Sequence, residues 1–371
     1  MAPSATVLSP ARGFRAELLR RGGGDAARCF QCATCSSVCD LTTSESAFPR
    51  RQMLWAQWGL ADRLAGDPSI WLCHQCNDCT ARCPRDASPG DAMQVIRALV
   101  IEHLGAPGFV ARLVGRARTT WPVLLGAPIV FWALYIGLVS GFAVPRTPLV
   151  YADLVPVWMI YSVFLPAGAF TLLAAFVGAR RTWRAWGEAS PRSGGLLAGL
   201  AGIVADVLVH RRFQRCEAAR PRKNGHLLLL WGFLGALLTT TLLGIQMDVF
   251  GLKTPLPQGH YIKLIGNASA VLLVVGLALL VANRTRGQGA GRTRAFDAFF
   301  LTLVAMVVLS GVGAELGRLF LPPAAALALY VVHLGTVLSL FLTFPFSKFA
   351  HALYRTLAMA HERLASERRP S

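Results

Sequence analysis

The sequence predicts a mostly α-helical protein in two parts, a small cysteine-rich helical domain followed by a bundle of six membrane-spanning helices. Three observations predict this class. The 371 residues are 54% hydrophobic with a mean hydropathy of +0.48, values typical of membrane proteins. Eight of the nine cysteines precede residue 84. No long apolar run occurs before Trp121, and six such runs follow it.

Residues 1–24 form a basic N-terminal segment, which we expect to be an arm. The segment lacks an apolar core of the length that a signal peptide requires. We therefore expect the cysteines that follow to stay in a reducing compartment, where a dense cysteine run favours metal over disulfides. The glycines of "RRGGGDAARC" precede a cysteine and do not open a helix after a strand, so they are no nucleotide or flavin fingerprint.

Residues 25–105, the expected cytoplasmic domain, hold two cysteine runs with the spacing C-x2-C-x2-C-x3-C. In proteins with two iron–sulfur clusters, the fourth cysteine of such a run binds the cluster of the other run. Zinc sites seldom use this doubled spacing. We therefore expect two [4Fe–4S] clusters. The first would be bound by Cys29, Cys32, Cys35 and Cys83, and the second by Cys39, Cys73, Cys76 and Cys79.

Four other polar residues are given no ligand role. His74 lies inside the second run and is expected to be a solvated neighbour of the cluster. Cys216 stands apart from the other cysteines and is expected to be a plain thiol. His103 and His361 have no evident partner and are expected at the surface.

Residues 106–120 are expected to be a linker, 121–355 the membrane domain and 356–371 a cytoplasmic tail. Each apolar run has about the ~20 residues that a helix needs to cross the hydrocarbon core. The stretch 195–213 is shorter and contains glycines and Asp206, so we expect an interfacial amphipathic helix there. The six spans are expected near 123–144, 157–178, 226–249, 263–283, 296–317 and 324–346.

The charges of the loops predict the orientation. Segment 179–225 carries ten Lys and Arg and segment 284–294 carries four arginines, whereas the alternate loops carry one or two. Basic loops stay in the cytoplasm, so both termini are expected on the cytoplasmic side of the inner membrane. The net charge of +18 thus has a topological explanation, and we expect no nucleic-acid partner.

Histidines in the apolar helices are candidate ligands of b-type haem. His333 and His351 are 18 residues apart in the last predicted span, which is five helical turns or ~27 Å. One unbroken helix would place both on one face, each with a different haem, although Pro345 between them can kink it. His226 opens the third span at the depth of His351, so these two are the first expected pair, near the cytoplasmic face.

Two resemblances extend these predictions. The segment "FPRRQMLWAQWGLADRLAGDPSIW" between the cysteine runs resembles the iron–sulfur subunit of heterodisulfide reductase over about residues 25–100; the residues that carry it are Pro49, Arg50, Gly59, Leu60 and Asp62. The 18-residue histidine pair with "PFSKF" resembles the cytochrome b subunit of respiratory nitrate reductase. That family has a second histidine ten residues after the equivalent of His226, where this chain has Ala236.

The partner of His333 is therefore open. His210 is the preferred candidate, and His260 and Met306 are the alternatives.

Together these features resemble the membrane subunit of the quinone-interacting membrane-bound oxidoreductase complex. The resemblance implies a small helical two-[4Fe–4S] ferredoxin-like domain followed by a six-helix transmembrane cytochrome b bundle with one or two haems b. It also implies electron exchange between membrane quinone and soluble flavin and iron–sulfur subunits that serve adenylylsulfate reductase in sulfur metabolism. Asp206, Glu315 and Lys263 could carry quinone protons, but structural or boundary roles are expected for them.

Two alternatives stay open. The chain could belong to a heterodisulfide-reductase-type complex or a sulfite-reductase-linked menaquinol complex, or it could be a membrane anchor for a ferredoxin domain without quinone chemistry. Haem content separates the anchor from the electron-transfer hypotheses. In none of them is the chain a complete enzyme alone.

Overall fold

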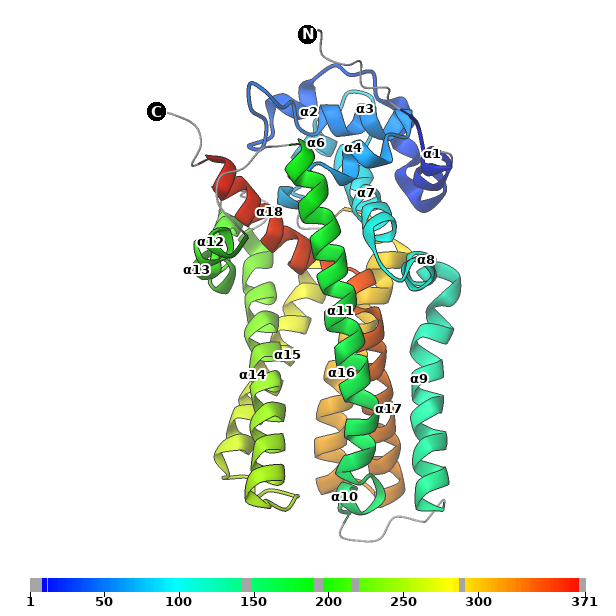
Figure 1. The fold of residues 1–371 in the computed structure, drawn as a ribbon, viewed down its shortest axis with the longest axis vertical. Coiled ribbons are helices and arrows are strands. Elements are labelled where there is room, and N and C mark those ends of the chain that lie inside the picture. Colours follow the sequence, from blue (N-terminus) through cyan, green and yellow to red (C-terminus); the bar gives the residue numbers. More distant parts are fainter. Residues whose placement is uncertain are drawn as a thin grey trace.

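The computed structural model describes residues 9–11, 13–141, 149–189, 196–214, 220–286 and 291–366. These residues are mostly helical, with one isolated bridge between Thr43 and Ser46. Figure 1 shows a small domain at one end of a bundle of long helices, with both termini at the end that carries this domain. The predicted fold class, a small helical domain followed by six long apolar helices, is confirmed.

The small domain, here called the cysteine domain, spans residues 14–104. Its longest helix, α7, is central, since fourteen of its sixteen residues are buried. Gly59 ends α3 in the left-handed region, with φ +71°, where a side chain would cost energy. The helices are α1 (Phe14–Leu18), α2 (Thr34–Ser37), α3 (Arg50–Trp58), α4 (Ala61–Ala65), α5 (Ser69–Leu72), α6 (Asp78–Ala81) and α7 (Pro89–Leu104), with π-helix η1 (Leu19–Gly23) and 3-10 helix η2 (Gly24–Arg28) after α1.

The predicted N-terminal arm is part of this domain. Residues 14–23 are helical, and Leu18 is 1% exposed within the main hydrophobic core. An apolar side chain at a helical position gains about 1.5–3 kcal/mol by burial, which explains why this segment folds onto α7. The described part of the predicted arm therefore packs on the cysteine domain.

Six helices are long and apolar enough to cross a membrane, and each overlaps one predicted span. The linker predicted at 106–120 is itself helical, because α8 (Gly108–Gly115) and the start of α9 occupy it. The long helices are α9 (Ala117–Ser140), α11 (Val157–Ala189), α14 (Arg220–Phe250), α15 (Tyr261–Thr285), α16 (Ala295–Phe320) and α17 (Pro323–Thr343); the short α10 (Tyr151–Leu154) precedes α11.

Helices α14 and α15 pack closely as an antiparallel pair, and small residues permit this. A Cβ added to Gly276 would lie 3.0 Å from the backbone nitrogen of Leu229, and one added to Gly232 would lie 2.7 Å from Cγ of Leu273. Close backbone approach through small residues is a common way for membrane helices to associate. Helices α9, α16 and α17 form a second group, with α11 against α17.

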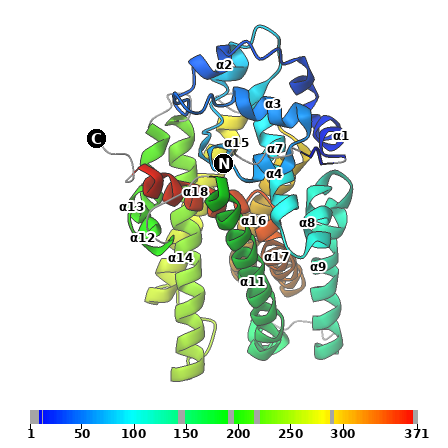
Figure 2. The same ribbon diagram turned by 45° about the horizontal axis from the view of Figure 1, so that its top comes forward.

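The last predicted span is not one helix. Helix α17 ends at Thr343, 3-10 helix η5 covers Phe344–Phe346, Ser347 is extended (φ −98°, ψ −173°), and α18 runs from Ala350 to Ser366. Pro345 cannot donate a backbone hydrogen bond and so favours this break. Figures 1 and 2 show α18 running obliquely beneath the cysteine domain. The inference that His333 and His351 share one helix face is therefore wrong.

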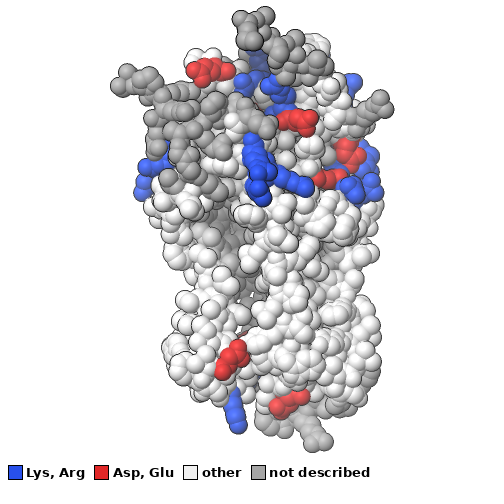
Figure 3. Space-filling view, in the orientation of Figure 1, with Lys and Arg blue, Asp and Glu red and all other residues white. Residues whose placement is uncertain are grey.

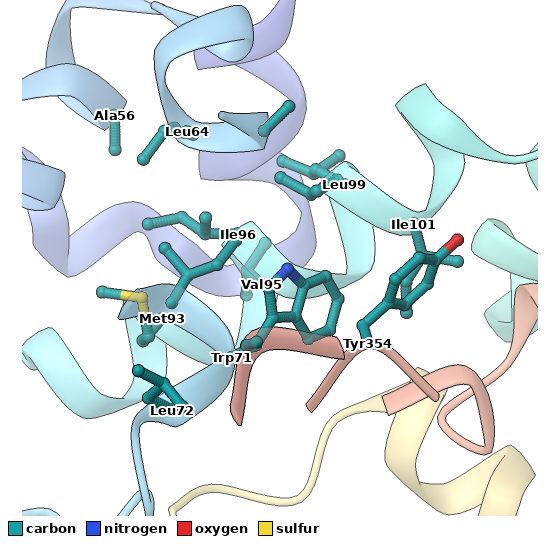
Figure 4. Packing of buried hydrophobic residues seen from close by; sticks show 14 of the residues in the cluster. Ala56, Leu64, Trp71, Leu72, Met93, Val95, Ile96, Leu99, Ile101 and Tyr354 are labelled. Carbon is teal, nitrogen blue, oxygen red and sulfur yellow. The ribbon is translucent and has the colours of Figure 1, made fainter. Parts of the chain in front are cut away.

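The described part of the predicted cytoplasmic tail belongs to α18, and much of it is buried. Leu357, Ala358 and Ala360 are each at most 3% exposed and belong to the same core as the cysteine domain. Figure 4 shows Tyr354 of α18 beside Trp71 of α5 within that core, with ring centroids 4.8 Å apart. The cysteine domain is therefore packed directly onto the C-terminal helix.

His361, expected at the surface, is 2% exposed. It lies between Trp183 and Trp186, with ring centroids 5.8 and 5.7 Å away. Trp186 donates a hydrogen bond to the backbone oxygen of Ala65 at 3.1 Å, which joins α11 to the cysteine domain. An amphipathic helix that packs at this junction explains the burial of His361.

The interfacial helix predicted at 195–213 is broken into α12 (Leu196–Ala201), α13 (Val204–Leu208) and the 3-10 helix η3 (Arg211–Gln214). Helix α12 packs on α18, where a Cβ on Gly199 would lie 3.1 Å from the backbone oxygen of Ala360. The described part of this stretch contains none of the helices that are long and apolar enough to cross a membrane. Cys216 lies outside the described residues.

Charged side chains are unevenly distributed along the molecule. Figure 3 shows Lys and Arg gathered near the cysteine domain, while the broad middle of the face shown carries neither blue nor red side chains. Many large apolar side chains on the long helices are exposed, among them Leu138, Leu172 and Val271. An uncharged apolar belt of this kind is what the hydrocarbon core of a bilayer requires.

Candidate functional site

The cysteines line two cavities at the end of the cysteine domain. Four of the lining residues of the first cavity, which has an empty volume of ≈ 320 Å³, are Cys29, Cys32, Cys35 and Cys83. The second cavity, with an empty volume of ≈ 970 Å³, is lined by Cys39, Cys73, Cys76 and Cys79 among others. The fourth cysteine of each run thus lies with the first three of the other run. This is the grouping that the crossed pattern predicts, and the ligand sets remain a prediction.

The two runs adopt the same backbone turn. Gln31 and Ala33 in the first run have φ of +61° and +70°, and Gln75 and Asn77 in the second have φ of +54° and +68°. Each pair flanks the second cysteine of its run. A left-handed conformation costs a residue with a side chain about 1–2 kcal/mol, so four such residues are strained in the same pattern. The turns bring three thiols of each run to one cavity, which fits a polynuclear cluster.

Three of the cysteine sulfurs accept hydrogen bonds. Cys29 Sγ accepts from Gln31 Nε2, Cys73 Sγ from the backbone nitrogen of Gln75, and Cys83 Sγ from that of Ala87, all at 3.3 Å. Such donors stabilise a thiolate and influence the potential of a bound cluster.

Crowding of the thiols is greatest at Cys79. Burial, aided by negative charge on the neighbouring Cys73, Cys39 and Cys35, raises the pKa of Cys79 to about 12. Coordination to iron removes this penalty, because the metal charge replaces the proton. Cys35 belongs to the first cavity and Cys79 to the second, so the two cavities are adjacent. Among the described residues no three His, Cys, Asp or Glu side chains are arranged for a single metal ion.

Three arginines from different helices surround the segment that enters the second run. Arg97 of α7 donates to the backbone oxygens of Ile70 and Cys73, both at 2.6 Å. Arg355 of α18 donates to those of Trp71, Leu72 and Cys73, each at 3.2 Å. Arg222 of α14 donates to those of His74 and Gln75, at 2.9 and 3.2 Å. Three guanidinium groups therefore meet at the Cys73 turn.

His74 is not a solvated neighbour as expected. Its Nδ1 lies 3.1 Å from Nη2 of Arg355. Burial, aided by the positive charges of Arg355, Arg97 and Arg222, lowers the pKa of His74 to about 3. The imidazole is therefore neutral at physiological pH.

His226 and His351 lie where the long helices meet the cysteine domain. His226 is near the start of α14, and His351 is in the first turn of α18. The two imidazoles interact electrostatically. The ring of His351 is 6.1 Å from that of Trp71, two residues before Cys73. Two partly buried imidazoles that interact from different helices are of the residue type that holds b-type haem, so the donor atoms are compatible with that group.

His333 occupies a different environment in α17. Its Nδ1 lies 3.2 Å from Oγ of Ser310, which also lies 3.3 Å from Oγ1 of Thr336. A Cβ on Gly311 would be only 2.9 Å from Cε1 of His333, so the ring packs closely on the backbone of α16. The described contacts of His333 do not include His210.

The structure brings His210 towards another histidine. The Nδ1 of His210 is 2.8 Å from the backbone oxygen of Val207, and the imidazole acts electrostatically on His226. Of the alternatives for His333, His260 caps the start of α15 and Met306 packs in an apolar cluster of α16. No second ligand for His333 emerges from the described residues.

The other polar residues have structural partners. Lys263 and Glu315 form an ion pair at 2.6 Å at the end of the bundle away from the cysteine domain. Asp206 pairs with Arg211 at 3.2 Å. His103 lies 3.1 Å from Asp62 and is 44% exposed in its side chain, consistent with the surface position expected for it.

Sequence reasoning missed the three arginines as site residues. Arg222 and Arg355 are among the basic residues that flank the spans, and nothing in the pattern separates them from charges that only set the topology. Arg97 lies in a helix without a motif. Only the convergence of α7, α14 and α18 distinguishes these side chains.

Comparisons with known proteins agree with the two-part architecture. The family model "4Fe-4S dicluster domain" matches residues 25–87, and the model "Citrate utilization protein B" matches residues 122–371. Citrate utilization protein B of Escherichia coli is 28% identical over 309 residues, which cover 78% of this chain and 79% of that protein. No solved structure gives a significant match.

The cysteine domain has its own relatives. A protein of Archaeoglobus profundus, named for its likeness to a heterodisulfide reductase subunit, is 36% identical over 90 residues, 24% of this chain and 48% of that protein. A subunit of the H(2):CoB-CoM heterodisulfide,ferredoxin reductase of Methanothermobacter thermautotrophicus is 34% identical over 82 residues, 22% of this chain and 44% of that protein. The chain thus spans about half the length of these two relatives, and the predicted resemblance of this domain is confirmed.

The cysteine domain therefore has the character of an iron–sulfur electron-transfer subunit, joined to helices that are long and apolar enough to cross a membrane. The family model that covers residues 122–371 accounts for the larger part of the sequence. This chain belongs to the Citrate utilization protein B family.

Proposed function

We propose that this protein exchanges electrons between the membrane quinone pool and soluble flavin and iron–sulfur subunits of one complex. The carriers would be haem b on His226 and His351 and the two [4Fe–4S] clusters. The observation that carries the proposal is the position of His351, whose ring is 6.1 Å from Trp71, two residues before Cys73. A haem on these histidines would adjoin the second cavity, so the membrane part and the cysteine domain share one route.

The arrangement of the residues supports an order along this route. The second cavity adjoins the His226 and His351 pair, and the first is reached through the neighbouring thiols Cys79 and Cys35. Cys32 at the first cavity is exposed. When bound, haem and the clusters supply one-electron carriers. The order we propose, written without a direction, is quinone, haem, second cavity, first cavity, soluble partner.

The rim of the first cavity is suited to a soluble partner. Phe30 is 68% exposed, and the guanidinium of Arg85 lies 4.1 Å from its ring centroid. Exposed aromatic and arginine side chains are frequent anchors of protein interfaces. We place the partner here, with the cysteine domain and both termini in the cytoplasm and the long helices in the inner membrane.

The partner follows from the relatives only as a proposal. The name of the Escherichia coli relative refers to citrate utilization, and it covers far more of this chain than the heterodisulfide reductase relatives do. We therefore favour a soluble oxidoreductase of citrate utilization as the partner. Adenylylsulfate reductase, or a heterodisulfide- or sulfite-linked menaquinol complex, is the second candidate, supported by the cysteine domain. Identification of co-purifying subunits by mass spectrometry separates the two.

The substitution His351→Ala tests the electron route. We expect loss of a haem α-band and loss of cluster reduction by quinol, because an imidazole ligand to the iron is removed. Dithionite should still reduce both clusters, since the cysteines are unchanged. His103→Ala, a surface histidine paired with Asp62, is the matched control and should behave as wild type.

Two outcomes would contradict the proposal. A wild-type haem spectrum in His351→Ala would mean that this histidine is structural. A wild-type protein without haem would favour the anchor alternative. His333→Ala should remove a separate haem signal if a second haem is bound, and redox titration of the α-band distinguishes one haem from two.

A further inference from the structure

The three arginines at the Cys73 turn are buried where charge is costly. Arg97 is 8% exposed, and Arg355 and Arg222 are partly buried. Their guanidinium N–H groups donate hydrogen bonds to backbone oxygens between Ile70 and Gln75. Carbonyl dipoles do not neutralise a full positive charge, and a buried charge without an opposite charge destabilises a protein. An anion is therefore expected near Arg97 and Arg355.

The carboxylates of the described residues do not supply this anion for Arg97 and Arg355. Among the described residues, neither Arg97 nor Arg355 has a carboxylate within ion-pair distance. The carboxylates that act on them from farther away are Asp297 and Glu362. Asp297 pairs with Lys348, and Glu362 pairs with Arg212. Both carboxylates are thus already engaged.

Cys73 is the principal anionic neighbour of both arginines. Both arginines donate to its backbone oxygen, at 2.6 and 3.2 Å, and its sulfur, negatively charged when bound to a cluster, would interact with both guanidinium groups. A [4Fe–4S] cluster with four thiolates carries net negative charge. A cluster in the second cavity would therefore supply the negative charge that is expected near Arg97 and Arg355.

We propose that Arg97, Arg222 and Arg355 form an arginine clamp that positions the Cys73 turn and raises the reduction potential of the cluster in the second cavity above that of the cluster in the first. This inference rests on the proposed clusters and does not depend on haem or quinone. The clamp acts through the backbone and through its charge, so its members are positioning residues. With the higher reduction potential, the cluster in the second cavity, on the membrane side, would be reduced in preference to the cluster in the first.

The first cavity lacks an equivalent among its described lining residues. Its arginines are Arg50, which is partly buried and acts on Cys32, and Arg85, which is exposed and rests on the ring of Phe30. Water and salt screen exposed charges far more than buried ones. Cluster potentials respond to net charge, hydrogen bonding and solvent exposure. The contrast between three guanidinium groups that converge on the Cys73 turn, one of them buried, and a single partly buried one at the first cavity predicts two different potentials within one small domain.

The test is a redox titration of both clusters, followed by electron paramagnetic resonance, on the full-length protein purified with its partners. Cys76→Ser, which should remove the second cluster, assigns the two signals. In the wild type the second cluster should titrate at the higher potential. Arg355→Gln and Arg222→Gln should each shift it to a lower potential and leave the first cluster nearly unchanged. Arg355→Lys keeps the charge and should retain most of the wild-type value.

Arg363→Gln is the matched control. Arg363 is on the same helix, eight residues or ~12 Å along the axis from Arg355, and donates to the backbone oxygen of Gly202 at 2.8 Å. This variant should leave both potentials unchanged. A shift as large as that of Arg355→Gln would show that the effect is not specific to the clamp.

The remaining outcomes are also decisive. Unchanged potentials in Arg355→Gln and Arg222→Gln, with both clusters assembled, would overturn the proposal, as would a lower wild-type potential for the second cluster. Loss of the second cluster in the Gln variants but not in Arg355→Lys would support a requirement for the charge. Loss in both kinds of variant would reduce the arginines to structural supports and overturn the tuning. Because the titration uses chemical mediators, a failed haem or quinone proposal leaves it interpretable.

Discussion

At the scale of single residues, the two cysteine runs share a backbone turn although three of the four residues between their first three cysteines differ. The spacers are Phe30-Gln31 and Ala33-Thr34 in one run, His74-Gln75 and Asn77-Asp78 in the other. The positive φ values fall at matching positions in both. The shared requirement is geometric: three thiols must reach one cavity within seven residues. Ligation of a cluster would offset the strain of these turns.

The crossing of the fourth cysteine predicts an effect in the other run. Cys39→Ser should damage the cluster in the second cavity, which Cys39 lines with Cys73, Cys76 and Cys79, because a serine hydroxyl is a poor iron ligand. Electron paramagnetic resonance of the reduced protein, compared with Cys76→Ser, measures this. Cys216→Ser, which removes the cysteine outside the two runs, should be neutral. Loss of the first cluster and survival of the second in Cys39→Ser would show that the ligands do not cross.

The close contact of Gly311 with His333 gives a second residue-scale prediction. A methyl group on Gly311 would lie 2.9 Å from the imidazole, whereas one on Gly313 would lie 3.5 Å from Leu329, an ordinary contact. Overpacking of a filled site costs about 1–3 kcal/mol. Gly311→Ala should therefore be less stable than Gly313→Ala by about this amount, as measured by thermal unfolding in lipid nanodiscs. Equal stability of the two variants would mean that His333 moves aside freely.

At the scale of elements, α18 connects the two parts of the molecule. On α18, His351 interacts with His226 of α14, and Arg355 donates a hydrogen bond to the Cys73 turn. On the same helix, Tyr354 packs against Trp71, and His361 lies between the tryptophans of α11. Its break from α17 after Thr343 allows it to run across the bundle. A straight continuation would have taken these side chains away from the cysteine domain. The break is therefore essential to the site.

This position makes α18 sensitive to core truncation. Leu357, 3% exposed, packs in the core shared with the cysteine domain, and Leu→Ala changes at such sites cost about 2–5 kcal/mol. Leu357→Ala should lower the thermal midpoint and the cluster content together. Leu138→Ala, at a side chain 75% exposed on α9, makes the same change on the lipid-facing surface and should alter neither by much. Retention of both properties in Leu357→Ala would show that the cysteine domain is stable without α18.

At the scale of the whole molecule, the basic side chains and both termini gather at one end of six long helices (Figures 1 and 3). The number of spans is even, so the two ends of the membrane part are on one side. The opposite end carries few charges, including the pair of Lys263 and Glu315. This asymmetry is what positive-inside insertion produces.

Reporter fusions test the resulting orientation. Fusions after residues 190 and 288 and at the C-terminus should report cytoplasm, and fusions after residues 150 and 256 the outer side. The C-terminus is preferred to an insertion after Ala360, because that residue is buried in α18. An alkaline phosphatase signal after residue 190 would contradict the six-span topology, and paired fluorescent-protein fusions at each site control for expression.

The sequence by itself determined the helical class, the six spans, the two cysteine runs and the kinship of the cysteine domain. These depend on local properties: apolar length, residue spacing and loop charge, each readable within about 20 residues. It also placed His226 and His351 at one end of the bundle, although it assigned His351 to the wrong helix.

Only the tertiary structure decided which side chains meet. The break at Pro345, the burial of α18, the contact of His361 with two tryptophans and the convergence of Arg97, Arg222 and Arg355 all join segments far apart in the chain. Basic residues that flank a span look alike in sequence, since the charge that orients a helix is the same charge that can surround a cluster. The packing of α7, α14 and α18 against one loop is what distinguishes them.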